Sequence, residues 1–258
     1  MRVVDLDRDM SDVIPTGATR DSQFLFDRMT GVALELLGAR AGRRLLDVAS
    51  GFGQDALELA RRGAQVVALE PSARMTNWAR ASAAKDAPIW VRGWSDALPF
   101  AAESFDGVVC KGAIDHFDRP GEAIAEMARV TRSSGRVVLA IANFESLACR
   151  LARAGDRWAE RRRPPRRGRR HYDVPADHFT RYDLALMQEQ ASRSLELEIV
   201  HGLSLGWGLP FWARAVERLP SRLARGALQA LDAVARGAPA WADVVVLAGR
   251  PRRSRSSR

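Results

Sequence analysis

Apolar and polar residues change their period along residues 43–70, and the change predicts a strand, a helix and a second strand. A short apolar run at 45–48 is typical of a buried strand. A turn of small residues follows, and an amphipathic helix begins after Gly53. Residues 65–69 then read as a second strand that ends at Glu70. Such units connect with a right-handed crossover, and their first turn is where doubly wound sheets bind nucleotides.

The turn predicts a pocket for an adenosine-bearing ligand. Gly51 and Gly53 have no Cβ, so the backbone can come close to a ligand there. Glu70 is placed to accept hydrogen bonds from ribose hydroxyls. The glycine spacing also matches the dinucleotide fingerprint. Asp47 argues against NAD, because a carboxylate inside an apolar strand needs a partner when buried and would repel a pyrophosphate.

The rest of the chain continues this alternation, which predicts an α/β fold with a doubly wound, mostly parallel sheet. The ligand is then expected at the carboxyl ends of the strands. Helices are expected at 21–37, 73–84, 121–130, 180–191, 213–218 and 221–235, and a further one ends at residue 158. Thr180 is the expected N-cap of the helix at 180–191. Further strands are expected at 89–91, 105–110, 136–142 after a loop at 133–135, 195–200 and 244–247. Residues 1–20 show no period and are expected to be a leader.

Four segments in this order resemble the core of class I S-adenosylmethionine-dependent methyltransferases. They read LLDVASGFG, VVALEPS, SDALPFAAESFDGVVCKGAIDHF and EMARVTRSSGRVVLAIANFES. The resemblance covers residues 43–146 and is closest to the small-molecule branch of the family, of the type 11 kind. It implies a seven-stranded Rossmann-like sheet with an antiparallel last strand, an N-terminal helical lid and a cap inserted after the fifth strand. The parts would be a leader and lid at 1–42, the cofactor core at 43–146, a cap at 147–212, C-terminal helices and strand at 213–249 and a basic tail at 250–258.

The same resemblance implies where S-adenosylmethionine binds as the cofactor. Asp47 would help to hold its methionine end, Glu70 its ribose, and Asp96 its adenine amino group. The other cofactor-binding residues expected are Ala49, Ser50, Gly51, Gly53, Pro71, Ala97, Leu98 and Lys111. The family usually has Gly at the position of Ala49, so we expect a slightly tighter turn and a retained site. Two roles stay open for Lys111, namely capping the strand edge and contacting an anionic group of the acceptor.

Two histidines are the candidate catalytic residues. Methyl transfer needs alignment of acceptor and methyl group, and in some reactions the removal of a proton. His116 follows the fourth predicted strand, and His178 lies in the region that forms the acceptor pocket in this family. Imidazole suits proton removal from a hydroxyl near neutral pH. Purely structural roles stay open for both, whereas His171 and His201 carry no clear signal.

Composition narrows the class of protein. A chain of 258 residues suits one domain with additions, and no uncharged apolar run reaches 18 residues. Together with an acidic N-terminus that lacks an apolar core, this leads us to expect a cytoplasmic protein. Cys110 and Cys149 are too few for a disulfide framework or a zinc site, and Cys110 is expected to be a buried small hydrophobe. We expect no metal site.

The net charge of +9 is concentrated in two segments. Residues 161–170 hold seven arginines and residues 250–258 hold five, and neither segment has an acidic residue. Without these twelve arginines the chain carries three more acidic than basic residues. We favour the interpretation that both segments are solvated, and contact with an anionic partner stays open.

The function expected is therefore methyl transfer to a small-molecule acceptor, most simply at a hydroxyl oxygen. Trp207, Phe211 and Trp212 belong to an aromatic stretch that would wall a pocket for an apolar acceptor, contact a membrane surface or pack on the sheet. Two alternatives stay open, an RNA-directed methyltransferase that uses the arginine-rich segments and a non-catalytic binder of an adenosyl ligand. An NAD-dependent oxidoreductase is disfavoured, because Asp47 and Asp96 would have no role in it. Nothing in the sequence indicates the oligomeric state.

Overall fold

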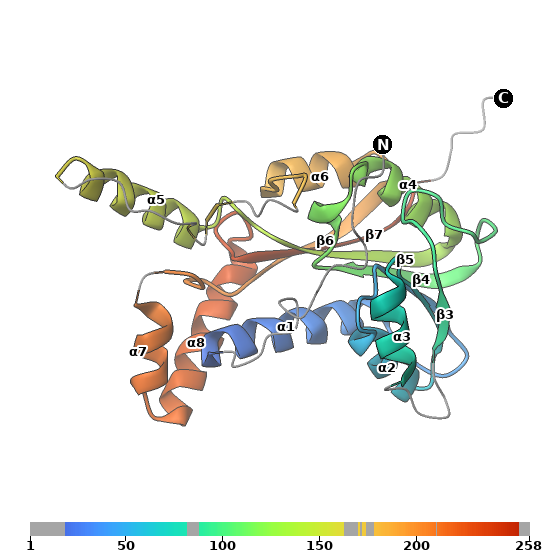
Figure 1. The fold of residues 1–258 in the computed structure, drawn as a ribbon, viewed down its shortest axis with the longest axis horizontal. Coiled ribbons are helices and arrows are strands. Elements are labelled where there is room, and N and C mark those ends of the chain that lie inside the picture. Colours follow the sequence, from blue (N-terminus) through green and yellow to red (C-terminus); the bar gives the residue numbers. More distant parts are fainter. Residues whose placement is uncertain are drawn as a thin grey trace.

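A computed structural model describes residues 19–81, 88–162, 170, 172–173, 178–209 and 211–252. These residues form one sheet of seven strands in the order β3-β2-β1-β4-β5-β7-β6 (Figure 1). The strands are β1 (Arg44–Val48), β2 (Gln65–Leu69), β3 (Ile89–Val91), β4 (Phe105–Lys111), β5 (Thr131–Ala142), β6 (Leu195–Leu203) and β7 (Val244–Pro251). The doubly wound α/β architecture expected from the sequence is confirmed.

The first five strands are parallel, and β7 runs antiparallel to β5 and β6. The antiparallel last strand is therefore confirmed. Asp47 in β1 lies opposite Ala68 in β2 and Val109 in β4. This register places the carboxyl ends of β1, β2 and β4 next to one another, where a doubly wound sheet binds its ligand.

One face of the sheet is covered by α4 (Pro120–Val130) and α6 (Leu184–Ser192), which lie above the sheet in Figure 1. Ile124 and Met127 of α4 and Met187 of α6 pack into the core of this face. The apolar residues of α4 recur every three or four positions, so one stripe of the helix is buried.

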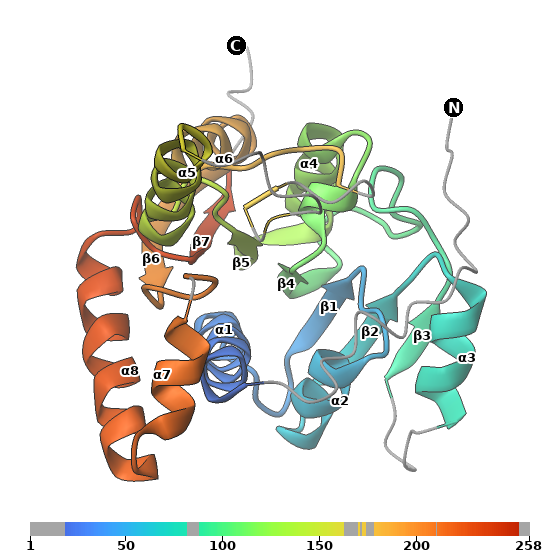
Figure 2. The same ribbon diagram turned by 60° about the vertical axis from the view of Figure 1, so that its left-hand side comes forward.

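The opposite face carries α1 (Arg20–Leu37), α2 (Gln54–Arg61), α3 (Ala73–Ala81), α7 (Trp212–Arg218) and α8 (Ser221–Gly237). Figure 2 shows α7 and α8 beside α1. α1 buries Leu25, Val32, Leu34 and Leu37 against the sheet, so it is a helix of this layer. A role of residues 1–42 as a lid stays a prediction, as does the division into parts. Among the described residues, every helix is too short or too polar to cross a bilayer.

Two of the boundaries that differ from those expected have a clear local cause. The loop expected at 133–135 is part of β5, where pairing with β4 jumps from Phe105↔Thr131 to Gly107↔Arg136. A Cβ on Gly135 would lie 2.8 Å from the Asp106 carbonyl oxygen, so only glycine lets the extra residues stay against β4.

The second difference concerns α6. The helix begins at Leu184, and its N-cap is Asp183, not Thr180. The Asp183 carboxylate accepts a hydrogen bond of 2.8 Å from the Leu186 N–H, which satisfies a free donor of the first turn. The sequence placed the start too early because Thr180 and Asp183 are both good N-cap residues.

Several expectations fall outside the described residues. These are the leader up to residue 18, the last residues of the helix expected at 73–84, His171, and most of the arginine-rich segments at 163–169 and 253–258.

Candidate active site

The turn after β1 adopts left-handed backbone at three positions. Ala49, Gly51 and Gly53 have φ values of 56°, 55° and 74°. The Gly53 N–H donates to the Ser50 carbonyl (2.8 Å), and the Ser50 N–H donates to Leu69 at the end of β2 (3.1 Å). Alanine tolerates this conformation at a cost of about 1 kcal/mol. The turn is therefore formed despite the departure at Ala49.

Gly53 is required by packing against the protein itself. A Cβ there would lie 2.1 Å from Cη2 of Trp90 in β3. A Cβ on Gly51 would meet nothing closer than the Met75 sulfur at 4.0 Å. Space for the predicted close approach of a ligand is therefore open at Gly51, whereas Gly53 makes room for an indole ring.

Glu70 ties the end of β2 to this turn. Its side chain is buried, and its two oxygens accept hydrogen bonds from the N–H groups of Gly51 and Ser72, both 2.9 Å. Burial raises the pKa of the carboxyl, and these two bonds act in the opposite direction. Each oxygen can accept a further bond. The neighbouring Pro71 carbonyl accepts from Arg92 (3.1 Å).

Three buried carboxylates lie near the turn, and one of them, Asp55, contacts an ammonium group. Asp47, Asp55 and Glu70 are each less than 8% exposed. Lys111 Nζ lies 2.7 Å from Asp55 Oδ1 and 2.6 Å from the Thr30 hydroxyl of α1. Burial, followed by the charge of Asp55, holds the pKa of Asp47 well above its usual value. Lys111 therefore has a structural partner, and sequence reasoning missed that partner, Asp55.

This charge distribution fits a cationic ligand. Oδ2 of Asp47 and the Ser50 hydroxyl are buried and have no hydrogen-bond partner among the described residues. A buried, unpartnered carboxylate oxygen next to further acids is costly unless a cation or donor completes it. S-adenosylmethionine carries an ammonium and a sulfonium group, whereas a pyrophosphate would add negative charge. The residues present fit the cofactor that the sequence led us to expect.

The expected adenine residues lie in different environments. Asp96 Oδ2 forms an ion pair with Arg119 (2.7 Å), which precedes α4. Ala97 is exposed, and Leu98 is buried in the core with its N–H donating to Glu126 (2.8 Å). Their contact with adenine stays a prediction.

Two distant segments bring both candidate histidines together. His116 lies in the short helix η2 (Ile114–His116) after β4, and His178 lies before α6. Their ring centroids are 4.0 Å apart. Nε2 of His178 lies 3.1 Å from Oδ2 of Asp115, and the Phe144 ring lies 5.9 Å from the His178 ring. Asp115 is 4% exposed, and its Oδ1 atom has no partner in the described structure.

Asp115 is the residue of this group that sequence reasoning missed. Its signal was its position beside His116, in a tripeptide that resembles the one around His178. The three residues offer ligand atoms within 4.8 Å of one another, a spacing that can hold a metal ion. The sequence shows no such grouping because the residues come from separate segments. Cys110 lies near both this group and Asp47, since both carboxylates act to raise its pKa.

Cys110, His201 and the aromatic stretch at 207–212 contact other parts of the fold. Cys110 is 1% exposed and burial raises its pKa, so it is the small hydrophobe expected. Burial lowers the pKa of His201 on β6. The Trp207 indole N–H donates to Ser22 of α1 (3.0 Å), and Trp212 packs beside Phe24. The aromatic stretch thus joins the start of α1 to the C-terminal helices, and its contact with an acceptor stays a prediction.

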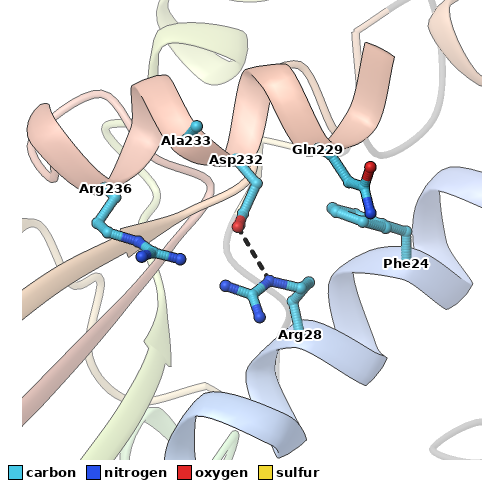
Figure 3. A pocket seen from close by; sticks show the side chains of 6 residues that line it. All are labelled: Phe24, Arg28, Gln229, Asp232, Ala233 and Arg236. Atoms are coloured by element: carbon cyan, nitrogen blue, oxygen red, sulfur yellow. Dashed lines mark hydrogen bonds and ion pairs between the residues drawn. The ribbon is translucent and has the colours of Figure 1, made fainter. Parts of the chain in front are cut away.

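A pocket of about 410 Å³ lies between α1 and α8 (Figure 3). Its lining contains Arg28, whose Nε lies 2.9 Å from Asp232 Oδ2, and Arg236. No residue expected at the cofactor or acceptor site lines it.

Comparison with known proteins finds relatives of the central part of this chain. Residues 46–139 match the family described as "Methyltransferase domain". The chain is 35% identical over 130 residues to a demethylmenaquinone methyltransferase of Renibacterium salmoninarum, covering 50% of this chain and 51% of that protein. It is 38% identical over 112 residues to a ubiquinone/menaquinone biosynthesis C-methyltransferase of Roseobacter denitrificans, covering 41% and 45% of the two chains. The match thus spans about half the length of these relatives.

Solved structures agree on the fold. The YcgJ protein of Bacillus subtilis superposes with a TM-score of 0.56 at 18% identity, over 88% of this chain and 99% of that one. The sheet order, the glycine turn with its acidic surroundings, and the matches from residue 46 to 139 all agree. Residues 46–139 of the chain therefore form a methyltransferase domain, and this region resembles the class I S-adenosylmethionine-dependent methyltransferases.

Proposed function

We propose that this protein transfers a methyl group from S-adenosylmethionine to a small-molecule acceptor that carries a hydroxyl group and an apolar portion. The observation that carries the proposal is the pairing of His178 with Asp115 close to the cofactor end of β4. A histidine held by a buried carboxylate is suited to accept a proton in the course of the reaction.

The residues around the turn would bind the cofactor. The carboxylate of Asp47 would attract the ammonium group, and Glu70 would accept hydrogen bonds from the ribose with the acceptor capacity left on its oxygens. Asp96, with Ala97 and Leu98, would lie at the adenine. When bound, the cofactor supplies an electrophilic methyl group, so the protein need only align the acceptor, exclude water and hold the proton.

The histidine pair would handle the acceptor. We assign His178 as the proton acceptor, since the buried carboxylate of Asp115 contacts and orients its ring. His116 lies against that ring and would shield it from water. Removal of a hydroxyl proton concentrates negative charge on the acceptor and makes it the stronger nucleophile.

The acceptor class follows from the chemistry and from the named relatives. Their names identify demethylmenaquinone and the biosynthesis of ubiquinone and menaquinone. An aromatic ring with a hydroxyl group becomes nucleophilic at oxygen and at the neighbouring ring carbon once the proton is lost. The same proton acceptor therefore serves methylation of either atom, and the name of one relative as a C-methyltransferase favours ring carbon as the second candidate after hydroxyl oxygen.

Two measurements test the proposal. Calorimetric titration of wild type and Glu70→Ala with S-adenosylmethionine, S-adenosylhomocysteine and NAD should show binding of the first two, weakened about 10- to 100-fold by the substitution, and none of NAD. Incubation with cofactor labelled in its methyl group and a panel of phenols and hydroquinones, with and without alkyl chains, should label an alkylated acceptor. NMR of the product then identifies the methylated atom.

Other results would replace the proposal. Labelling of RNA alone would select the RNA-directed enzyme. Tight cofactor binding with no labelling of the small-molecule panel or of RNA would select the non-catalytic binder.

A further inference from the structure

Helix α5 (Leu147–Glu160) presents an exposed apolar stripe. Leu151 is 51% exposed and Trp158 is 58% exposed, and Ala154 is exposed between them. Spacings of three, four and seven residues place these side chains on one side of a helix. The buried residues of α5 are Ala148, Cys149 and Ala152, so the stripe points away from the protein. In Figure 1 the helix extends away from the sheet.

A row of arginines runs beside this stripe. Arg150, Arg157 and Arg161 are exposed and recur at seven and four residues, which places them on the flank next to Ala154. Within the described part of the chain, neither Arg157 nor Arg161 forms an ion pair. Arg162 lies over the Trp158 ring at 4.3 Å from its centroid.

We propose that α5 binds the surface of an anionic phospholipid membrane. A helix with Trp and Leu on one side and arginines on its flank lies in the headgroup region, with apolar side chains inserted and guanidinium groups on phosphates. The exposed aliphatic side chain of Leu151 favours lipid over RNA, because RNA contacts rely on cations and stacked aromatic rings. The arginine row favours an anionic lipid surface over an apolar protein partner.

The N-terminal half of α5 lies next to the candidate active site. α5 is the next element along the chain after β5. Its residue Arg153 donates to the carbonyl oxygen of Phe144 (2.9 Å), and the Phe144 ring contacts His178. A membrane-bound α5 would place the acceptor side of the protein near the lipid phase. Delivery of an apolar acceptor rests on the proposed function, whereas membrane binding by α5 does not.

Sedimentation of the full chain with vesicles tests the proposal without any need for turnover. We expect binding to vesicles of phosphatidylglycerol and phosphatidylcholine, and at least tenfold weaker binding to phosphatidylcholine alone. Leu151→Ala with Trp158→Ala keeps every arginine and should weaken binding about tenfold or more. Arg157→Gln with Arg161→Gln should weaken binding to the anionic vesicles and reduce its sensitivity to salt.

The matched control is Leu223→Ala with Val234→Ala on α8, where the side chains are 62% and 56% exposed. These changes should leave vesicle binding unchanged. Circular dichroism and thermal unfolding must match wild type for every variant. Absence of vesicle binding, or binding that survives Leu151→Ala with Trp158→Ala, would overturn the proposal. Binding to RNA in place of vesicles, sensitive only to the arginine changes, would assign the surface to RNA.

Discussion

Nε2 of His178 lies 3.1 Å from Oδ2 of Asp115, and this contact joins the segment before α6 to the turn after β4. The N–H groups of Phe179 and Thr180 also donate to the Asp115 carbonyl oxygen, at 2.8 and 3.2 Å. Side chain and backbone of one aspartate thus bind three consecutive residues, 178–180. An imidazole fixed in this way is suited to the proton transfer proposed for His178.

His178→Ala is expected to reduce kcat about 10²- to 10⁴-fold, the usual contribution of a positioned proton acceptor. Asp115→Asn should reduce kcat less, since the amide oxygen can still hold the ring although the negative charge beside it is lost. Steady-state kinetics and titration with S-adenosylhomocysteine check this, and cofactor affinity should stay within about threefold. His201→Ala on β6 is the matched control. A His178→Ala enzyme with wild-type kcat would leave His178 a structural role only.

Metal removal separates the two readings of the Asp115, His116 and His178 cluster. If His178 accepts the proton, dialysis against EDTA should leave turnover unchanged, because a proton acceptor needs no ion. Metal analysis of the purified protein and turnover after dialysis are the measurements. Loss of activity that returns with Zn²⁺ or Mn²⁺, together with metal binding that disappears in His178→Ala, would instead establish a metal site.

Cofactor affinity should rise with pH in the range above the ordinary pKa of an aspartate carboxyl and below the ordinary pKa of an α-amino group. The reason is that burial and Asp55 hold the pKa of Asp47 above its usual value, and only the ionised carboxylate attracts an ammonium group. Titration with S-adenosylhomocysteine at several pH values measures the slope. Asp47→Asn should bind more weakly with a flatter slope, whereas Asp106→Asn, whose carboxyl has a lowered pKa, should keep it. An unchanged slope in Asp47→Asn would exclude this role.

Gly53→Ala is expected to destabilise the fold by roughly 2–5 kcal/mol, from left-handed backbone and collision with Trp90. Urea unfolding measures the loss. In a Trp90→Ala background the same change should cost clearly less, because the collision is gone. Gly226→Ala on α8, where a Cβ meets nothing within 4 Å, should stabilise by about 0.5–1 kcal/mol. Equal costs of Gly53→Ala in both backgrounds would exclude the packing explanation.

Stability should fall as pH rises through about 6, owing to Asp243 at the start of β7. Burial raises the pKa of this carboxyl from 3.8 to about 6, although the Trp207 N–H donates to it at 2.9 Å. A raised folded-state pKa gives a contribution that is complete below 3.8 and lost above about 6, at most about 3 kcal/mol. Urea unfolding at several pH values should show a flatter dependence for Asp243→Asn. The same slope in both proteins would assign the loss to other groups.

The sequence by itself determined the sheet and the position of the glycine turn after β1. Alternating periods located all seven strands, because buried parallel strands and amphipathic helices leave strong local patterns. Glu70 and the glycine turn could be found for the same reason, since they lie within one strand–helix–strand unit. Local patterns failed at element ends, where two good N-caps competed at Thr180 and Asp183, where a bulge kept 133–135 inside β5, and where β6 and β7 extend beyond the expected strands.

Only the tertiary structure decided which groups act together. Asp115 meets His178, Lys111 meets Asp55, and Gly53 makes room for Trp90, and in each case the partners come from different elements. Such contacts depend on how helices and loops pack over the sheet, and no spacing along the chain encodes them. The exposure of Leu151 and Trp158 is of the same kind, because an amphipathic pattern does not say which side of a helix meets the protein.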